Sequence, residues 1–164
     1  MKTISITLSM LAMVLACASP KKETTETPVK VETVMQKQDL TNVINAYITL
    51  KDALVASDID LAKAGTTTLL SELKSAEIDE SIISSANQIA EAKDIKEQRA
   101  AFKTLTNQMI PVLKAASNDM TVYVQYCPMA FNNEGGNWLS LSEEIRNPYY
   151  GDMMLKCGRV TEKL

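Results

Sequence analysis

The chain has 164 residues, 46% of them hydrophobic, and a formal net charge of −3. This length suits one domain of ordinary size, and the slight acidic excess without a basic cluster argues against nucleic acid as a partner. Histidine is absent, which excludes Ser-His and Cys-His nucleophile pairs and His-ligated zinc, and with them most hydrolase functions.

The first 17 residues have the features of an export signal. Lys2 precedes an apolar run from Ile4 to Val14, which is shorter than the about 20 apolar residues that span a bilayer. The run ends in Val14-Leu15-Ala16-Cys17, which resembles the lipobox of bacterial lipoproteins. We therefore expect residues 1–17 to be a lipoprotein signal peptide ending at a lipidated Cys17; an ordinary signal peptide with an incidental cysteine is the alternative.

A lipidated Cys17 would anchor the protein to a membrane without spanning it. By analogy with envelope sorting, Ala18 points to the outer membrane, and we favour the periplasmic side over the cell surface. Residues 18–37 are rich in Lys, Glu and Thr, so we expect a flexible tether. Export also places the remaining cysteines where disulfides persist.

Residues 38–164 are expected to form one mainly α-helical domain. Apolar residues recur at helical spacing in four segments, which run from Leu40 to Val55, from Ile59 to Leu73, from Ile82 to Ala90 and from Phe102 to Leu113. Because the connections between these segments are short, we predict an antiparallel four-helix bundle.

Several residues indicate where these helices begin and end. Asp39 should cap the first helix and Asp58 the second, and the third should follow Asp79. Asp94 and Glu97 have the spacing of a capping box for the fourth helix. Pro111 should kink that helix or end its regular part near Ile110.

The amino-acid composition of the chain changes near residue 120. Residues 121–126 are β-branched and aromatic, which is typical of a strand, and residues 132–137 and 147–151 have the composition of a loop and a turn. We therefore expect a small C-terminal β-containing flap, which carries both remaining cysteines and several methionines.

Four sulfur-bearing residues in this flap are the candidate metal ligands: Cys127, Met129, Met153 and Cys157. Pro128 favours extended geometry at Cys127, so Cys127 and Met129 should project to one side. Met153 and Cys157, four apart, share a face in either a helix or a strand. Thiolates and thioethers without imidazole suit Cu(I) or another soft ion. Tyr126, Trp138 and Met154 are expected to lie around these ligands.

The same residues carry a resemblance to a known family. The motifs are Tyr126-Cys127-Pro128-Met129-Ala130, Trp138-Leu139-Ser140, Ile145-Arg146-Asn147-Pro148-Tyr149-Tyr150-Gly151 and Met153-Met154-Leu155-Lys156-Cys157-Gly158. Together they resemble domain-of-unknown-function family 3347. Arg99-Ala100-Ala101-Phe102 with Leu105 resembles its helical motif, with Thr106 where a serine is expected. The resemblance covers about Leu40 to Val160.

Members of that family are typically envelope lipoproteins, or domains attached to membrane-fusion subunits of heavy-metal efflux systems. The resemblance therefore implies the handling of copper or a related metal, with an efflux membrane-fusion protein as partner. We expect a metal-binding accessory to efflux or metal homeostasis.

The rival interpretation is a disulfide between Cys127 and Cys157 in an interaction module that binds no metal. It would close a loop of about 30 residues and stabilise the fold by roughly 3 kcal/mol.

A catalytic cysteine would need activation by Lys156, Arg159 or a helix end. With no histidine and no Cys-x-x-Cys pair, we expect that the protein is not an enzyme.

The other conspicuous side chains have structural explanations. Trp138, Tyr149 and Tyr150 should form a small aromatic core that joins the flap to the helices. The charged residues Glu143, Glu144 and Arg146 should lie on a solvated face.

Overall fold

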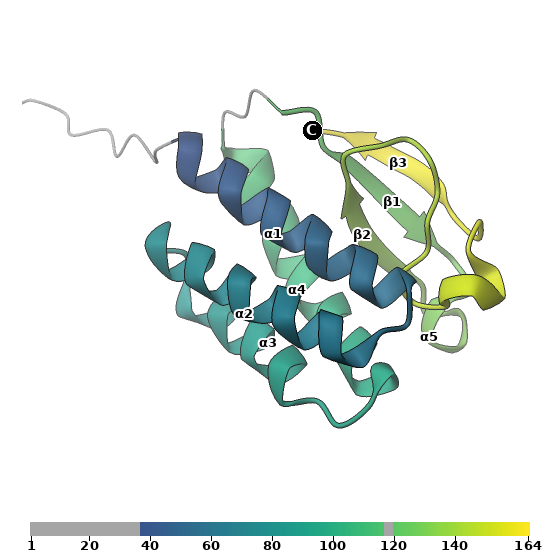
Figure 1. Cartoon of the computed structure of the whole chain (residues 1–164). Helices are drawn as coiled ribbons and strands as arrows, with labels where there is room; N and C mark the ends of the chain where they lie inside the picture. Colours follow the sequence, from purple (N-terminus) through teal and green to yellow (C-terminus); the bar gives the residue numbers. More distant parts are fainter. Residues whose placement is uncertain (1–36, 117–119) are drawn as a thin grey trace, which may run out of the picture. The chain divides into compact units, whose positions relative to one another are not determined.

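Four long helices precede a small antiparallel sheet in the chain (Figure 1). The computed structural model describes residues 37–116 and 120–164. The predicted signal peptide and almost all of the predicted tether lie outside these residues. The expectation of a mainly α-helical domain with a C-terminal β-containing part is confirmed.

The elements follow one another with short connections. The long helices are α1 (Lys37–Val55), α2 (Ile59–Ser75), α3 (Glu80–Glu91) and α4 (Ile95–Ala115). The C-terminal part contains β1 (Tyr123–Cys127), the short helix α5 (Ala130–Asn133), β2 (Gly136–Ser140), the 3-10 helix η1 (Gly151–Met154) and β3 (Arg159–Lys163).

Three of the long helices begin at an aspartate whose side chain accepts a backbone hydrogen bond. Asp58 accepts from the Leu61 amide at 2.9 Å, and Asp79 accepts from the Ser81 amide at 2.8 Å. These bonds satisfy amides that have no partner within the helix. The predicted Asp58 cap is confirmed, and α3 follows Asp79 as expected.

The predicted capping box is half confirmed. Asp94 accepts from the Glu97 amide at 2.8 Å, as the motif requires. The Glu97 carboxylate, however, accepts from the Lys93 amide at 2.9 Å, one residue before the cap. It therefore still pairs an amide at the helix start, and it also ties the connecting segment to α4.

One predicted helix start was wrong. Helix α1 begins at Lys37, so Asp39 lies inside the helix and is not its cap. Of the two outcomes predicted for Pro111, the helix does not end near Ile110, because α4 runs through Pro111 to Ala115; a kink at Pro111 stays a prediction. Pro111 lacks an amide hydrogen, which leaves the Asn107 carbonyl without its helical donor. Asn107 is exposed, so water can take the donor's place.

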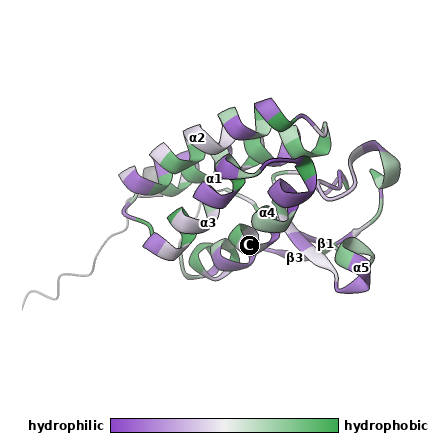
Figure 2. Ribbon diagram, turned by 90° about the horizontal axis from the view of Figure 1, so that it is seen from below, coloured by the Kyte–Doolittle hydropathy of each residue, from purple (hydrophilic) through white to green (hydrophobic). Residues whose placement is uncertain are grey.

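The long helices pack in sequence order, α1 on α2, α2 on α3 and α3 on α4. Gly65 explains how closely α2 approaches α1, because a Cβ atom at this position would lie 3.2 Å from the Leu50 Cα atom. Glycine lowers the helix propensity of α2, but here it allows the two backbones to meet. Apolar residues of the helices gather on their inward sides, as the colours in Figure 2 show.

The three strands form one antiparallel sheet in the order β2-β1-β3. Strand β1 pairs with β2 in continuous register from Tyr123 opposite Ser140 to Cys127 opposite Gly136. Its pairing with β3 shifts between Val124 and Gln125. Strand β2 contacts α4 and α1, so the sheet is attached to the helices through an edge strand (Figure 1).

Aromatic side chains fill the junction between helices and sheet. The Tyr47 and Phe102 rings stack at 5.1 Å, and the Tyr149 ring lies 6.0 Å from both Phe102 and Trp138. This confirms the predicted aromatic core for Trp138 and Tyr149. Tyr150 lies at its margin and is only half-buried.

The described helices include none that is long and apolar enough to cross a membrane. The predicted solvated face is confirmed, because Glu143, Glu144 and Arg146 are all exposed.

Removing the Tyr47 hydroxyl should weaken the junction. This buried hydroxyl hydrogen-bonds with Thr106 Oγ1 at 2.6 Å and accepts from the Leu139 amide at 3.2 Å. Tyr47→Phe removes both bonds and takes this acceptor from the buried Leu139 amide, so the free energy of unfolding should fall by about 1–3 kcal/mol, measured by urea titration. Tyr126→Phe is the control, because no described residue hydrogen-bonds its hydroxyl; an equal loss in both variants would contradict this account.

Candidate dithiol site

Cys127 is the last residue of β1 and is fully buried. Its position is set by the sheet, because it pairs with Gly136 of β2. Gly136 has no side chain because the Tyr149 ring occupies the space, only 2.7 Å from where a Cβ atom would stand. The first thiol is therefore held by a strand on one side and by the aromatic core on the other.

Cys157 lies in the loop between η1 and β3, and Asn147 fixes that loop. The side-chain Nδ2 of Asn147 donates to the Cys157 carbonyl at 2.9 Å, and the backbone amide of Asn147 donates to the Leu155 carbonyl at 2.9 Å. The same side chain accepts from the Tyr149 amide at 2.8 Å. Asn147 is buried. Its bonds to backbone groups therefore hold the backbone of the loop that carries Cys157.

The two sulfur atoms lie together at the end of β1. The Sγ atoms of Cys127 and Cys157 are 2.8 Å apart, and both residues are free cysteines. This separation exceeds the about 2.05 Å of a disulfide bond. The structure thus brings together two thiols that are thirty residues apart in the sequence.

The environment of Cys157 favours its protonated form. Its hydrogen bond with the Cys127 thiol, followed by desolvation and the charge of Cys127, raises the pKa of Cys157 from 9.0 to about 11, while a hydrogen bond from the Met129 backbone lowers it. The thiol is therefore neutral at pH 7, where it is a poor nucleophile. This state does not suit an activated catalytic cysteine.

The methionines lie around the dithiol at different degrees of exposure. Met129 has helical backbone geometry, so the strand alternation expected from Cys127 ends before it, and its side chain is 46% exposed. Its carbonyl accepts from the Tyr150 hydroxyl at 2.6 Å. Met153 is 77% exposed. Whether either thioether is a ligand stays a prediction.

The backbone places Met154 in a better position than Met153 to act as a ligand beside Cys157. The Cys157 amide donates to the Met154 carbonyl at 3.0 Å, which continues the turn that η1 begins. In such a turn side chains three residues apart lie above one another. Met154 is also less exposed than Met153.

Trp138 supports the dithiol from behind. A Cβ atom at Gly158 would lie 2.7 Å from the indole ring of Trp138, so the residue after Cys157 must be small. The indole nitrogen donates to Gln125 at 2.6 Å, and Gln125 donates in turn to the carbonyls of Ser142 and Glu144. Trp138 thus links the sheet, the following loop and the Cys157 segment.

Arg99 is a positioning residue whose role the sequence did not show. From α4 it donates to the Pro148 carbonyl at 2.7 Å and to the Leu54 carbonyl at 3.0 Å. It also donates to Ser57 Oγ at 2.8 Å. The signal was its place in the Arg99–Phe102 motif, which pointed to importance without giving a partner.

The described residues contain no group of three or more His, Cys, Asp and Glu side chains that could hold a metal ion. An ion at the dithiol would therefore take its further ligands from thioether sulfur or from outside these residues. Thioethers are soft donors, which suits Cu(I) better than magnesium or calcium.

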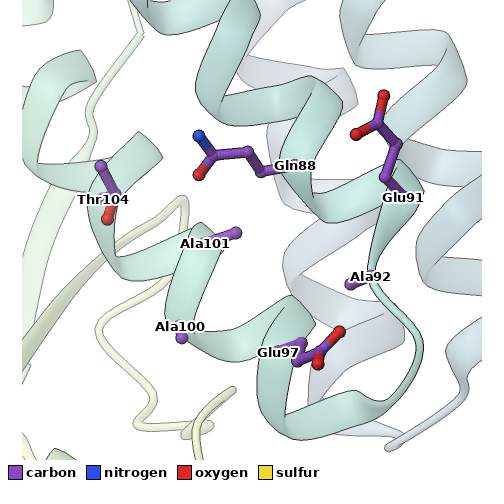
Figure 3. Close-up of a pocket in the computed structure, with 7 residues that line it drawn as sticks. All are labelled: Gln88, Glu91, Ala92, Glu97, Ala100, Ala101 and Thr104. Carbon is purple, nitrogen blue, oxygen red and sulfur yellow. The ribbon is translucent and has the colours of Figure 1, made fainter.

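A separate hollow of about 410 Å³ lies between α3 and α4 (Figure 3). Three alanines leave it open, and its polar walls include Glu91 and Glu97. Glu97 is already used at the start of α4. This hollow contains no sulfur and no cationic side chain among its lining residues.

Comparison with known proteins supports the family resemblance. Residues 43–121 match the model of a family described as Protein of unknown function (DUF3347). The resemblance predicted from the motifs is confirmed over these residues, which run from α1 to just before β1 and end before Cys127. No curated protein and no solved structure matches the chain.

The raised pKa of Cys157 predicts a loss of stability at alkaline pH. The folded thiol holds its proton more tightly than the unfolded thiol, so its contribution is complete below pH 9.0 and is lost as the pH rises towards about 11. Urea midpoints of the reduced protein should therefore fall more steeply over this range than those of Cys157→Ser. Both proteins contain the same tyrosines and lysines; parallel midpoint curves would contradict the assigned shift.

Proposed function

We propose that the protein binds a soft metal ion, Cu(I) in particular, through Cys127 and Cys157. The observation that carries the proposal is the 2.8 Å separation of two free sulfurs. Met129 and Met153 are the proposed further ligands, and Met154 is added because of its position one turn before Cys157. Two thiolates and thioethers form a donor set that favours soft ions.

Binding an ion requires the two thiols to separate. An ion about 2.3 Å from both sulfurs at their present spacing would make an angle of roughly 75°, against about 109° in a tetrahedral site. Cys127 is fixed in the sheet, whereas Cys157 is partly exposed and lies in a loop. Cys157 is therefore the residue that would move.

Binding would also displace protons. A metal-bound thiol is deprotonated, and the pKa of Cys157 is raised by its neighbour and by burial. Affinity should therefore increase with pH. A hard ion would gain little from such a site, whereas the strength of copper–thiolate bonding can offset the cost of deprotonation.

The cellular setting belongs to the same proposal. Lipidation at Cys17 would place the domain in the envelope, at the outer membrane and facing the periplasm, with a metal-efflux membrane-fusion protein as partner. In this setting the protein delivers metal and does not catalyse a reaction. The bundle arrangement of the helices is also proposed, and the sequential packing of α1 to α4 supports it.

The second candidate is an interaction module with a structural disulfide between Cys127 and Cys157. The same sulfur spacing favours it, because a small movement would bring the sulfurs to bonding distance. The two functions exclude each other at any instant, since a sulfur in a disulfide is no longer a thiolate.

A copper titration separates the two candidates. The full chain in a Cys17→Ser background, fully reduced, should bind one Cu(I) in competition with a chelator. Changing both Cys127 and Cys157 to serine should weaken binding by more than about 100-fold, which exceeds the usual effect of losing a residue that only supports a ligand. Met120→Leu is the matched methionine control and should leave the affinity unchanged.

The contrary outcome is equally clear. Equal and weak binding by the reduced protein and the double serine variant would overturn the metal proposal. Complete oxidation of both thiols in protein taken directly from the envelope, measured by mass after alkylation, would favour the structural disulfide.

A further inference from the structure

A second cleft lies between α4, α5 and the turn that follows Asn147, and it has a volume of about 420 Å³. This volume lies within the range of small-molecule sites. Its walls combine two cations with aromatic rings, and the residues that matter are Lys96, Arg99, Phe131, Glu134, Tyr149 and Tyr150. None of these residues is a proposed ligand of the dithiol site.

Arg99 is a buried cation that lacks an anionic partner. Its side chain is only 8% exposed, yet no described carboxylate forms an ion pair with it. Its hydrogen bonds use Nε and Nη2 with neutral oxygen acceptors, which leaves Nη1 without a partner among residues 37–116 and 120–164. Buried charges are usually paired, so this guanidinium is suited to an anion in the cleft.

The opposite wall has an unusual backbone. Phe131, Asn132 and Asn133 are three consecutive residues with positive φ, at 53°, 57° and 70°. Positive φ is disfavoured for a bulky residue such as phenylalanine, and conformations of this kind gather at functional sites. The hydrogen bond from the Gly135 amide to the Ala130 carbonyl at 2.9 Å closes the turn.

Lys103 holds this wall in place. Its Nζ atom lies 4.6 Å from the centre of the Phe131 ring and 3.0 Å from the Glu134 carboxylate. The only acidic side chain among the lining residues is therefore already paired. The Phe131 ring meets Tyr149 edge to face at 5.0 Å, which gives the cleft an ordered apolar surface.

Lys96 adds a second positive charge at the cleft. It is exposed, and no described carboxylate pairs with it. With Arg99 it provides two cations on one turn of α4, opposite the apolar wall. Together these groups match a ligand that is negatively charged at one end and planar and apolar at the other.

We propose that this cleft binds the carboxylate of a small aromatic acid, with Arg99 and Lys96 holding the carboxylate and the rings of Phe131 and Tyr150 contacting the apolar part. The carboxyl terminus of a peptide that ends in an aromatic residue has the same chemistry. The proposal does not depend on metal binding, because the dithiol takes no part in the contacts.

Binding of benzoate to the full chain tests the proposal. Titration followed by NMR should give a dissociation constant at or below about 1 mM. Benzamide, which keeps the ring but lacks the charge, should bind at least about tenfold more weakly, since it loses the charge-assisted bonds. If the titration curves of neither benzoate nor benzamide saturate, or if the two ligands bind with equal affinity, the proposal is overturned.

Variants locate the binding and identify the source of the carboxylate. Lys96→Gln should weaken benzoate binding at least about threefold, because it removes one partly solvated charge, whereas Lys93→Gln, three residues earlier on the exposed surface, should have no effect. Equal effects of both substitutions would overturn the assignment to this cleft. The tripeptide Ala-Ala-Phe, compared with benzoate, shows whether a peptide carboxyl terminus binds better than a small aromatic acid. If the free tripeptide binds better than its amidated form, or benzoate better than benzamide, the result supports recognition of the carboxylate.

Discussion

The candidate site depends on the hydrogen bonds of one buried arginine. The Arg99 guanidinium joins the end of α1, Ser57 in the connection to α2 and the Pro148 carbonyl. Next to Pro148, Asn147 turns the chain and holds the Cys157 carbonyl. The position of the second thiol is therefore set by helices far from it in sequence. This explains why a helical scaffold and a cysteine-bearing flap belong to one structure.

The two thiols differ in how firmly they are held. Cys127 is part of a sheet that packs on α1 and α4 through β2, so its sulfur cannot move without disturbing the core. Cys157 is held by backbone bonds in a partly exposed loop, which leaves its side chain freer to change position. Cys157 is therefore the thiol whose side chain can change position while the sheet stays intact.

Much of the helical part could be predicted because local signals determine it. The aspartates at Asp58, Asp79 and Asp94 show where three helices begin, and apolar spacing shows which faces are buried. The sequence left two outcomes open at Pro111, since the continuation of α4 depends on packing that outweighs one lost hydrogen bond. Strand β3 was missed, because all five of its residues are exposed and show no alternation.

The candidate site could be predicted only in part. The proximity of Cys127 and Cys157 was predicted from the chemistry of their sulfur atoms. The residues that bring it about are Asn147 and Arg99. Neither shows these partners in a single sequence, because the Arg99 partners lie more than forty residues away and the Cys157 carbonyl lies ten residues beyond Asn147. The cleft beside Arg99 was missed for the same reason, and the left-handed turn at Phe131 has no signature other than the asparagines that follow it.

The strand order leaves β3 at one edge of the sheet, where the ion pair between Lys114 of α4 and Glu162 of β3 links it to the long helices. An edge strand can recruit a strand from another molecule and so begin aggregation. Here Arg159 and Lys163 lie over the rings of Tyr126 and Tyr123. Cations along such an edge discourage a second chain from adding to it.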